Sequence, residues 1–115
     1  MLVTLKIKRI MLARHKVDFR KSHDGLLAEA YKLGLSPMAG DVVIFIGRDK
    51  RRVKLLYSDA NGLWLSYKRF SNSAMKSEFS FCSDPAANKI TTSDLALLLD
   101  GARYELFCRP DDDPE

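Results

Sequence analysis

Residues 40–70, GDVVIFIGRDKRRVKLLYSDANGLWLSYKRF, form the stretch that decides the fold. Residues 42–46 are a continuous apolar run bounded by glycines, which is typical of a strand covered on both faces. Residues 53–57 and 63–68 are predicted as the next two strands, and the Asn61-Gly62 pair between them suits a hairpin turn with positive φ. We therefore expect an antiparallel meander whose first loop is strongly basic.

The N-terminal part is predicted to form one strand and the main helix. Loose apolar alternation within residues 3–14 indicates a half-buried strand that becomes more buried toward its end. Residues 17–34 are predicted to be helical, with Asp18 as the candidate N-cap, Ser22 as the alternative one turn later, and Gly34 at the C-cap. The apolar residues at near-helical spacing that should face the core are Phe19, Leu26, Leu27, Ala30 and Leu33.

The C-terminal part has weaker patterns. Residues 78–82 are expected to be a short strand at the edge of the sheet, and residues 83–89 a loop. Thr91 and Asp94 stand at capping-box spacing and predict the start of a second, short helix that ends at Gly101. Residues 104–107 are apolar enough for a last short strand or a docked coil.

The predicted fold class is α+β: a mostly antiparallel sheet of about four to five strands, one main helix and a short C-terminal helix. A chain of 115 residues supports a single core, so we expect one domain over residues 1–109. The acidic segment 110–115 is expected to be a disordered tail.

Composition excludes several classes of protein. No apolar run reaches the roughly 18 residues of a membrane span, and the N-terminus lacks the pattern of a signal peptide, so a cytoplasmic location is expected. Cys82 and Cys108 are interpreted as two buried free thiols, with a disulfide between them as the alternative. Without close Cys/His spacing, neither a structural zinc site nor another cofactor is predicted.

The net charge of +4 hides two basic segments. Residues 1–21 hold seven Lys or Arg and one Asp, and residues 47–70 hold seven Lys or Arg and two Asp. Arg20 and Lys21 would lie in the first helical turn, where the helix dipole disfavours cations, so a role in partner binding is favoured there. The charge indicates a polyanion such as nucleic acid as the partner; a solvated basic surface is the alternative.

Three segments resemble one family. They are residues 18–26 with the order D-x-R-K-S-x-D-G-L, residues 54–70 with K-L-L-Y-x-D-x-x-G-L-W-L-x-Y-K-R-F, and residues 95–101 with L-A-L-L-L-D-G. Together they resemble TnpB, the accessory protein from the second open reading frame of insertion sequences of the sixty-six type. The resemblance implies a role in transposition of a bacterial mobile element, beside a separate transposase. The family's Trp-Pro segment after the Lys-Arg pair is absent here, where residues 73–79 stand in its place.

An enzyme is not predicted. A two-metal nuclease needs several converging carboxylates, and the candidates are Asp18, Asp24, Glu29, Asp41, Asp49 and Asp59. Most of them have a simpler structural explanation. Asp18 can cap a helix, and Asp49 and Asp59 can serve as turn residues. Asp24 can form an ion pair with Arg20. Neither His15 nor His23 has a nucleophile partner in the sequence.

A DNA-binding accessory factor is the favoured function. The candidate contacts are Arg20, Lys21, Arg48, Lys50, Arg51, Arg52, Lys54, Lys68 and Arg69. The last two stand beside Tyr67 and Phe70, and cations next to aromatic rings suit contact with a nucleic-acid strand; Trp64 is expected to pack in the sheet. The alternative is an adaptor that docks on the transposase, or on a second copy of the chain, without touching DNA.

Overall fold

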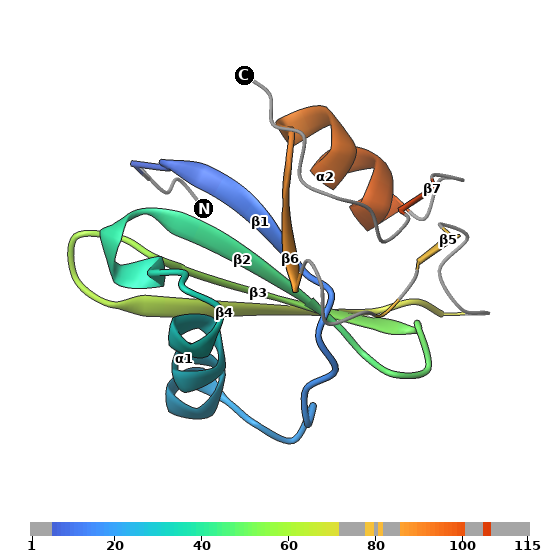
Figure 1. Cartoon of the computed structure of the whole chain (residues 1–115), viewed down its shortest axis with the longest axis horizontal. Coiled ribbons are helices and arrows are strands. Elements are labelled where there is room, and N and C mark those ends of the chain that lie inside the picture. Colours follow the sequence, from blue (N-terminus) through green and yellow to red (C-terminus); the bar gives the residue numbers. More distant parts are fainter. Residues whose placement is uncertain (1–5, 72–77, 80, 82–85, 101–104, 107–115) are drawn as a thin grey trace.

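The computed structural model describes residues 6–71, 78–79, 81, 86–100 and 105–106 (Figure 1). The chain forms, in order, β1 (Arg9–Ala13), α1 (His23–Lys32), the 3-10 turn η1 (Pro37–Ala39), β2 (Asp41–Ile46), β3 (Arg52–Ser58), β4 (Leu63–Arg69), β5 (Glu78–Phe79), β6 (Ala87–Ile90), α2 (Thr92–Asp100) and β7 (Glu105–Leu106).

Five of these strands make one mixed sheet in the order β4-β3-β2-β1-β6. The β2–β3, β3–β4 and β1–β6 pairs are antiparallel, so the predicted three-strand meander is confirmed. β1 and β2 are parallel, and α1 lies in the crossover that a parallel pair requires. The predicted α+β class, with a main helix and a short C-terminal helix, is correct.

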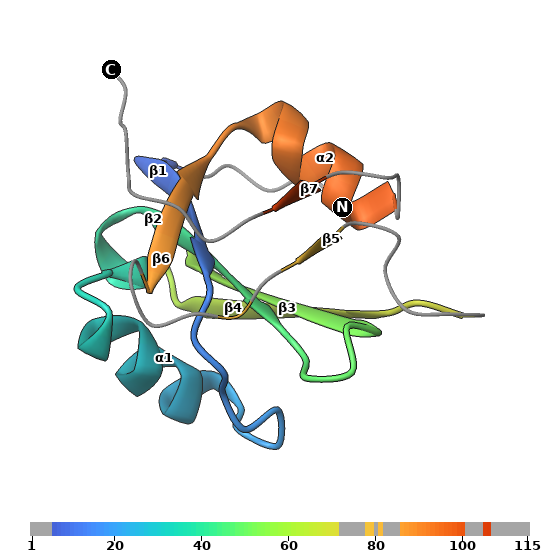
Figure 2. The same cartoon turned by 45° about the vertical axis from the view of Figure 1, so that its right-hand side comes forward.

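The sheet is the middle layer of three. α1 lies against one face and α2 against the other, as the two views show (Figures 1 and 2). All six residues of β2 are buried, as expected for a strand covered on both faces. The buried residues on the α1 face are Met11, Ala13, Leu26, Ala30, Leu35, Val43, Phe45 and Leu56. Those on the α2 face are Ile10, Leu12, Val42, Ile44, Ile46, Val53 and Leu98.

Helix α1 begins later than predicted. Its N-cap position is Ser22, the alternative from the sequence, whereas Asp18 lies four residues before it. Arg20 and Lys21 therefore precede the helix, and the expectation that they lie in its first turn is wrong. The C-terminal end matches the prediction: Gly34 has φ +76°, and the Leu35 N–H donates to the Ala30 carbonyl at 2.9 Å, which closes a Schellman motif.

The turn after β3 differs from the prediction in its geometry. The backbone of Asn61 and Gly62 does not adopt positive φ. Instead the Asp59 carboxylate accepts the N–H groups of both residues, at 2.8 and 3.0 Å, and the Trp64 indole N–H at 2.7 Å. A carboxylate that caps its own turn replaces the left-handed geometry expected for an Asn-Gly pair.

The C-terminal part is where the prediction fails most. Residues 87–89, expected in a loop, belong to β6, which pairs with β1 at the edge of the main sheet. β5 is not at that edge but pairs with β7 in a separate two-stranded sheet. The capping box of α2 is confirmed, because Thr91 and Asp94 exchange hydrogen bonds at 3.0 Å in both directions. Residues 1–5, both cysteines, Gly101 and the acidic tail lie outside the described residues.

Among the described helices, none is both long and apolar enough to cross a membrane.

Candidate nucleic-acid interface

The parallel pairing of β1 with β2 brings two basic segments to one end of the sheet. Since Leu12 pairs with Ile44, the chain that leaves β1 and the chain that leaves β2 emerge at the same end. The antiparallel β3 begins at that end, and β4 finishes there, with Arg52 opposite Arg69. Residues 14–21, the β2–β3 loop and the last residues of β4 are therefore neighbours, although the sequence separates them by up to 55 residues.

The β2–β3 loop is held in a defined shape. The Gly47 N–H donates to the Arg52 carbonyl at 2.8 Å, and the Lys50 N–H donates to the Gly47 carbonyl at the same distance. Lys50 has φ +58°, in the left-handed region. The Asp49 carboxylate accepts the Arg51 N–H at 3.0 Å, and this bond holds the pKa of Asp49 below its usual value. Arg48 and Arg51 are exposed on this loop.

Lys54 fixes the chain before α1 onto the sheet. Its ammonium group donates to the Phe19 carbonyl at 2.6 Å and to the Lys21 carbonyl at 2.9 Å. The residue is only 9% exposed, and burial lowers the pKa of its ammonium group. Lys54 was a candidate DNA contact from the sequence, but its amino group is directed at the protein's own backbone. It positions Arg20 and Lys21 instead.

Two aromatic rings surround this lysine. The Phe19 and Tyr67 rings meet edge to face, with 6.5 Å between their centroids. The Lys54 Nζ lies 4.9 Å from the Phe19 centroid and 5.5 Å from that of Tyr67, and the Arg52 guanidinium carbon lies 5.2 Å from the Phe19 centroid. Cation–π attraction between these groups holds cationic side chains at the surface of the sheet.

The remaining candidate cations lie nearby. Arg20 is exposed and pairs with Asp18, whose carboxylate accepts its Nη2–H at 2.8 Å; these bonds lower the pKa of Asp18. Arg20 thus pairs with Asp18 rather than with Asp24, as the sequence had suggested. Lys68 crosses to the other face of the sheet, where its ammonium group donates to the Leu99 carbonyl and lies 5.0 Å from the Phe70 centroid.

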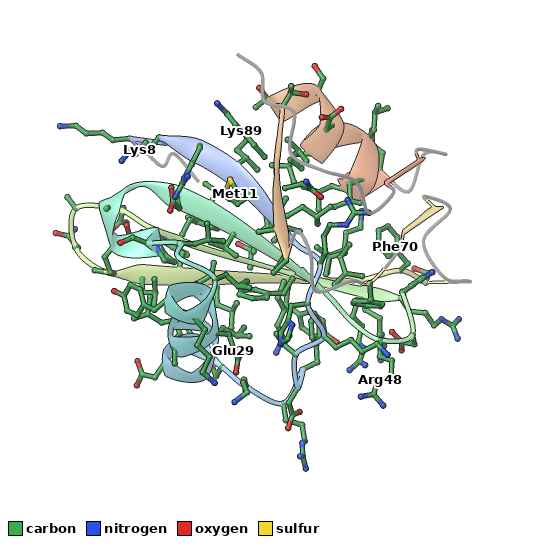
Figure 3. All side chains as sticks on the ribbon, viewed as in Figure 1. Lys8, Met11, Glu29, Arg48, Phe70 and Lys89 are labelled. Carbon is green, nitrogen blue, oxygen red and sulfur yellow. The ribbon has the colours of Figure 1, made fainter. Side chains whose placement is uncertain are left out.

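We define the basic rim as the eight exposed or half-buried cations at this end: Arg20, Lys21, Arg48, Lys50, Arg51, Arg52, Lys68 and Arg69. Three carboxylates lie among them or pair with them, Asp18, Glu29 and Asp49, so this group carries a formal charge of +5. Lys8 lies at the opposite end of the sheet from Arg48 (Figure 3), since residue 8 precedes β1 whereas the loop follows β2. Arg14, counted in the basic N-terminal segment, is 2% exposed and donates to Asn88.

Five of the six carboxylates considered for catalysis, all but Asp24, have structural partners of their own among the described residues. Asp41 is buried and accepts two hydrogen bonds from the Arg9 guanidinium, at 2.7 and 3.1 Å, and one from the Ser36 N–H at 2.7 Å. Burial alone would raise the pKa of Asp41, but these bonds outweigh it and lower the pKa. Glu29 pairs with Lys21 and Lys32. In the part of the chain that the structure describes, no three His, Cys, Asp or Glu side chains are grouped to hold a metal ion.

Sequence reasoning missed Phe19 as part of this surface. Its position in the apolar pattern assigned it to the core face of the helix, yet it precedes α1 and packs against Tyr67 and Lys54. The signal that could have revealed it is the Asp-Phe-Arg-Lys order itself, an aromatic residue placed among charged ones.

Comparison with known proteins agrees with the family suggested by the motifs. The sequence profile of the family described as "IS66 Orf2 like protein" matches residues 8–108. The chain belongs to this family. Members of the IS66 Orf2-like family are accessory proteins of insertion sequences.

A curated relative shares part of the chain. The "Uncharacterized protein y4jC" of Sinorhizobium fredii (strain NBRC 101917 / NGR234) is 38% identical over 61 residues, which is 52% of either chain. The chain thus spans about half the length of the curated relative it matches. No solved structure matches the sequence.

Proposed function

We propose that this IS66 Orf2-like protein binds the DNA of its insertion sequence through the basic rim, while a separate transposase performs the chemistry. On this proposal the protein is a non-catalytic DNA-binding factor of recombination that works in the bacterial cytoplasm. The observation that carries the proposal is the gathering of eight cations, from three separate parts of the chain, at one end of the sheet.

A cluster of positive charge at one end of the sheet suits the negatively charged phosphate backbone of DNA. Each phosphate neutralised by Lys or Arg releases condensed counterions, and this release drives binding and makes it sensitive to salt. Three carboxylates offset part of this charge: Asp18 pairs with Arg20, Glu29 with Lys21, and Asp49 with the loop backbone and with Arg52 at 3.4 Å. The rim keeps a formal charge of +5 that can attract an anionic partner.

The test is a binding titration of labelled DNA, followed by fluorescence anisotropy across a salt series. The wild-type protein should bind with an affinity that falls steeply as salt rises. A triple variant with Arg48→Ser, Arg51→Ser and Arg69→Ser should bind more weakly, and its slope of log K against log salt should be less steep by about 2 to 3.

A matched control removes the same charge elsewhere. Lys8, Lys32 and Lys89 are exposed and lie outside the rim, and Figure 3 shows Lys8 and Lys89 away from Arg48. Replacing these three residues by Ser should leave the slope within about 1 of the wild type. Equal losses in both triple variants would show that binding follows net charge and not the rim, and absence of binding would refute the proposal.

A second candidate function is docking on the transposase without DNA. It is favoured by β4, which is the last strand of the sheet and has no further strand paired with it among the described residues. An unpaired edge can accept a strand from a partner. A pull-down of the transposase that is unaffected by nuclease treatment and by the rim variant would support this function instead.

A further inference from the structure

We propose that Tyr67 stacks on an unpaired nucleobase, so that the protein prefers single-stranded DNA segments to duplex DNA. This inference rests on the proposed function, since it assigns the kind of DNA that the basic rim holds. Nothing in the family role specifies such a site.

Tyr67 is unusually exposed for an aromatic residue in a strand. It lies on the α1 face of β4, opposite Lys54, and 56% of its surface is accessible. On its inner side the Tyr67 ring contacts two groups: the Lys54 amino group lies 5.5 Å from the ring centroid, and the Phe19 ring meets it edge to face. Because β4 is the edge of the sheet, no described strand covers the ring on the outer side.

The contacts on the inner side fix the ring in place. Tyr67 is held between a cross-strand lysine and an aromatic partner that is itself fixed by the Lys54 hydrogen bond to the Phe19 carbonyl. A ring that is already ordered loses little conformational entropy when a base stacks on it. By contrast, Tyr31, the other highly exposed tyrosine among the described residues, is 51% exposed and lies at the far end of α1 from the segment that carries Arg20 and Lys21.

Cations stand where the phosphates of such a strand would pass. Arg69 follows Tyr67 by two residues and therefore lies on the same face of β4. Its pairing partner on the neighbouring strand β3 is Arg52. Arg20 and Lys21 approach from the segment that Lys54 holds against this face. An aromatic ring surrounded by cations is the combination by which proteins bind single strands, through stacking on the base and attraction to the backbone.

A duplex cannot use the ring in this way. Its bases are stacked on one another and only their edges are accessible in the grooves, so an edge-strand tyrosine can stack only on a base that is unpaired. Duplex binding would depend on the cations alone. The two kinds of DNA should therefore respond differently to loss of the ring.

The experiment compares Tyr67→Leu with Tyr67→Phe and with the control Tyr31→Leu. Binding of a labelled oligothymidylate and of a blunt-ended DNA duplex is measured by anisotropy at one salt concentration, and urea midpoints verify that every variant is folded. Tyr67→Leu should bind the single strand roughly 5- to 100-fold more weakly and the duplex within about twofold of wild type. Tyr67→Phe and Tyr31→Leu should resemble the wild type on both.

The outcomes separate this inference from the function on which it rests. If Tyr67→Leu binds both DNAs as the wild type does, while the rim triple variant loses affinity, the stacking site is refuted and DNA binding stands. If the wild type binds neither DNA, both fail. A second readout is photo-crosslinking of 5-bromodeoxyuridine oligonucleotides: the adduct should map to Tyr67, and an adduct confined to other residues would overturn the assignment.

Discussion

Replacing Lys54 by Met should destabilise the protein and release the chain before α1. The wild-type ammonium group makes two hydrogen bonds to backbone carbonyls, at 2.6 and 2.9 Å, from a position that is 9% exposed. Hydrogen bonds that involve a charged group contribute about 1.5 to 3 kcal/mol each. Methionine keeps most of the apolar stem and avoids the burial of a charge, which offsets part of the loss.

We therefore expect the free energy of unfolding to fall by about 2 kcal/mol, which for a domain of this size lowers Tm by roughly 6 to 8 °C. Urea unfolding followed by circular dichroism measures the first quantity, and a thermal scan measures the second. Hydrogen exchange should also become faster at the amides of residues 20–22, because the segment loses its anchor.

The matched control is Arg48→Met, which removes the same charge from an exposed loop position. It should change the free energy of unfolding by less than about 0.5 kcal/mol. If Lys54→Met is as stable as the wild type and exchange at residues 20–22 is unchanged, Lys54 does not hold this segment, and the account of how the rim is assembled is wrong.

Three further predictions concern stability. Asp41→Asn should lower the free energy of unfolding by about 2 kcal/mol in urea titrations, because it removes the charge of a buried carboxylate that pairs with the half-exposed Arg9; an equally stable variant would show that the pair contributes nothing. The pKa values of Asp41 and Asp49 lie below the usual value, so the unfolded chain binds protons first as pH falls. The contribution of these two carboxylates to the free energy of unfolding should thus be fully present above about pH 4 and be lost as pH falls below it. The loss should be smaller in Asp41→Asn; a flat profile would contradict this. Thr91→Ala removes half of the α2 capping box and should cost about 1 kcal/mol, whereas Thr92→Ala, one residue later, should cost less.

The meander could be predicted because its signals are local. The apolar run of β2 and the alternation in β3 and β4 specify strands whatever the rest of the chain does. β6 could not be predicted in the same way. Its sequence, Ala-Asn-Lys-Ile, has few β-forming residues, and only the pairing with β1, some 75 residues earlier, makes it a strand.

The start of α1 was placed too early for a related reason. Asp18 is a good N-cap residue and Phe19 continues the helical apolar spacing, so the pattern predicts a helix from there. In the structure the Lys54 amino group, 35 residues away, binds the Phe19 carbonyl, and Phe19 packs against Tyr67. A tertiary contact has overridden the local preference, which no reading of the segment alone could reveal.

The candidate cations could be identified from the sequence, but their proximity in the folded protein could not. Whether residues 20–21 lie beside the β2–β3 loop depends on β1 running parallel to β2, and an antiparallel pair would have placed them at opposite ends. Likewise, no local pattern indicates that the Lys54 side chain is buried while Arg52, on the same face of β3, remains half exposed.

The most direct test of the basic rim is a titration of the isotopically labelled protein with a short single-stranded oligonucleotide, followed by backbone amide NMR shifts. The account predicts that the largest shifts cluster at residues 19–21, 47–52 and 67–70, three segments that only the folded sheet brings together. Shifts centred on Lys8, Lys89 or the exposed side of α1, or spread evenly over the molecule, would contradict it.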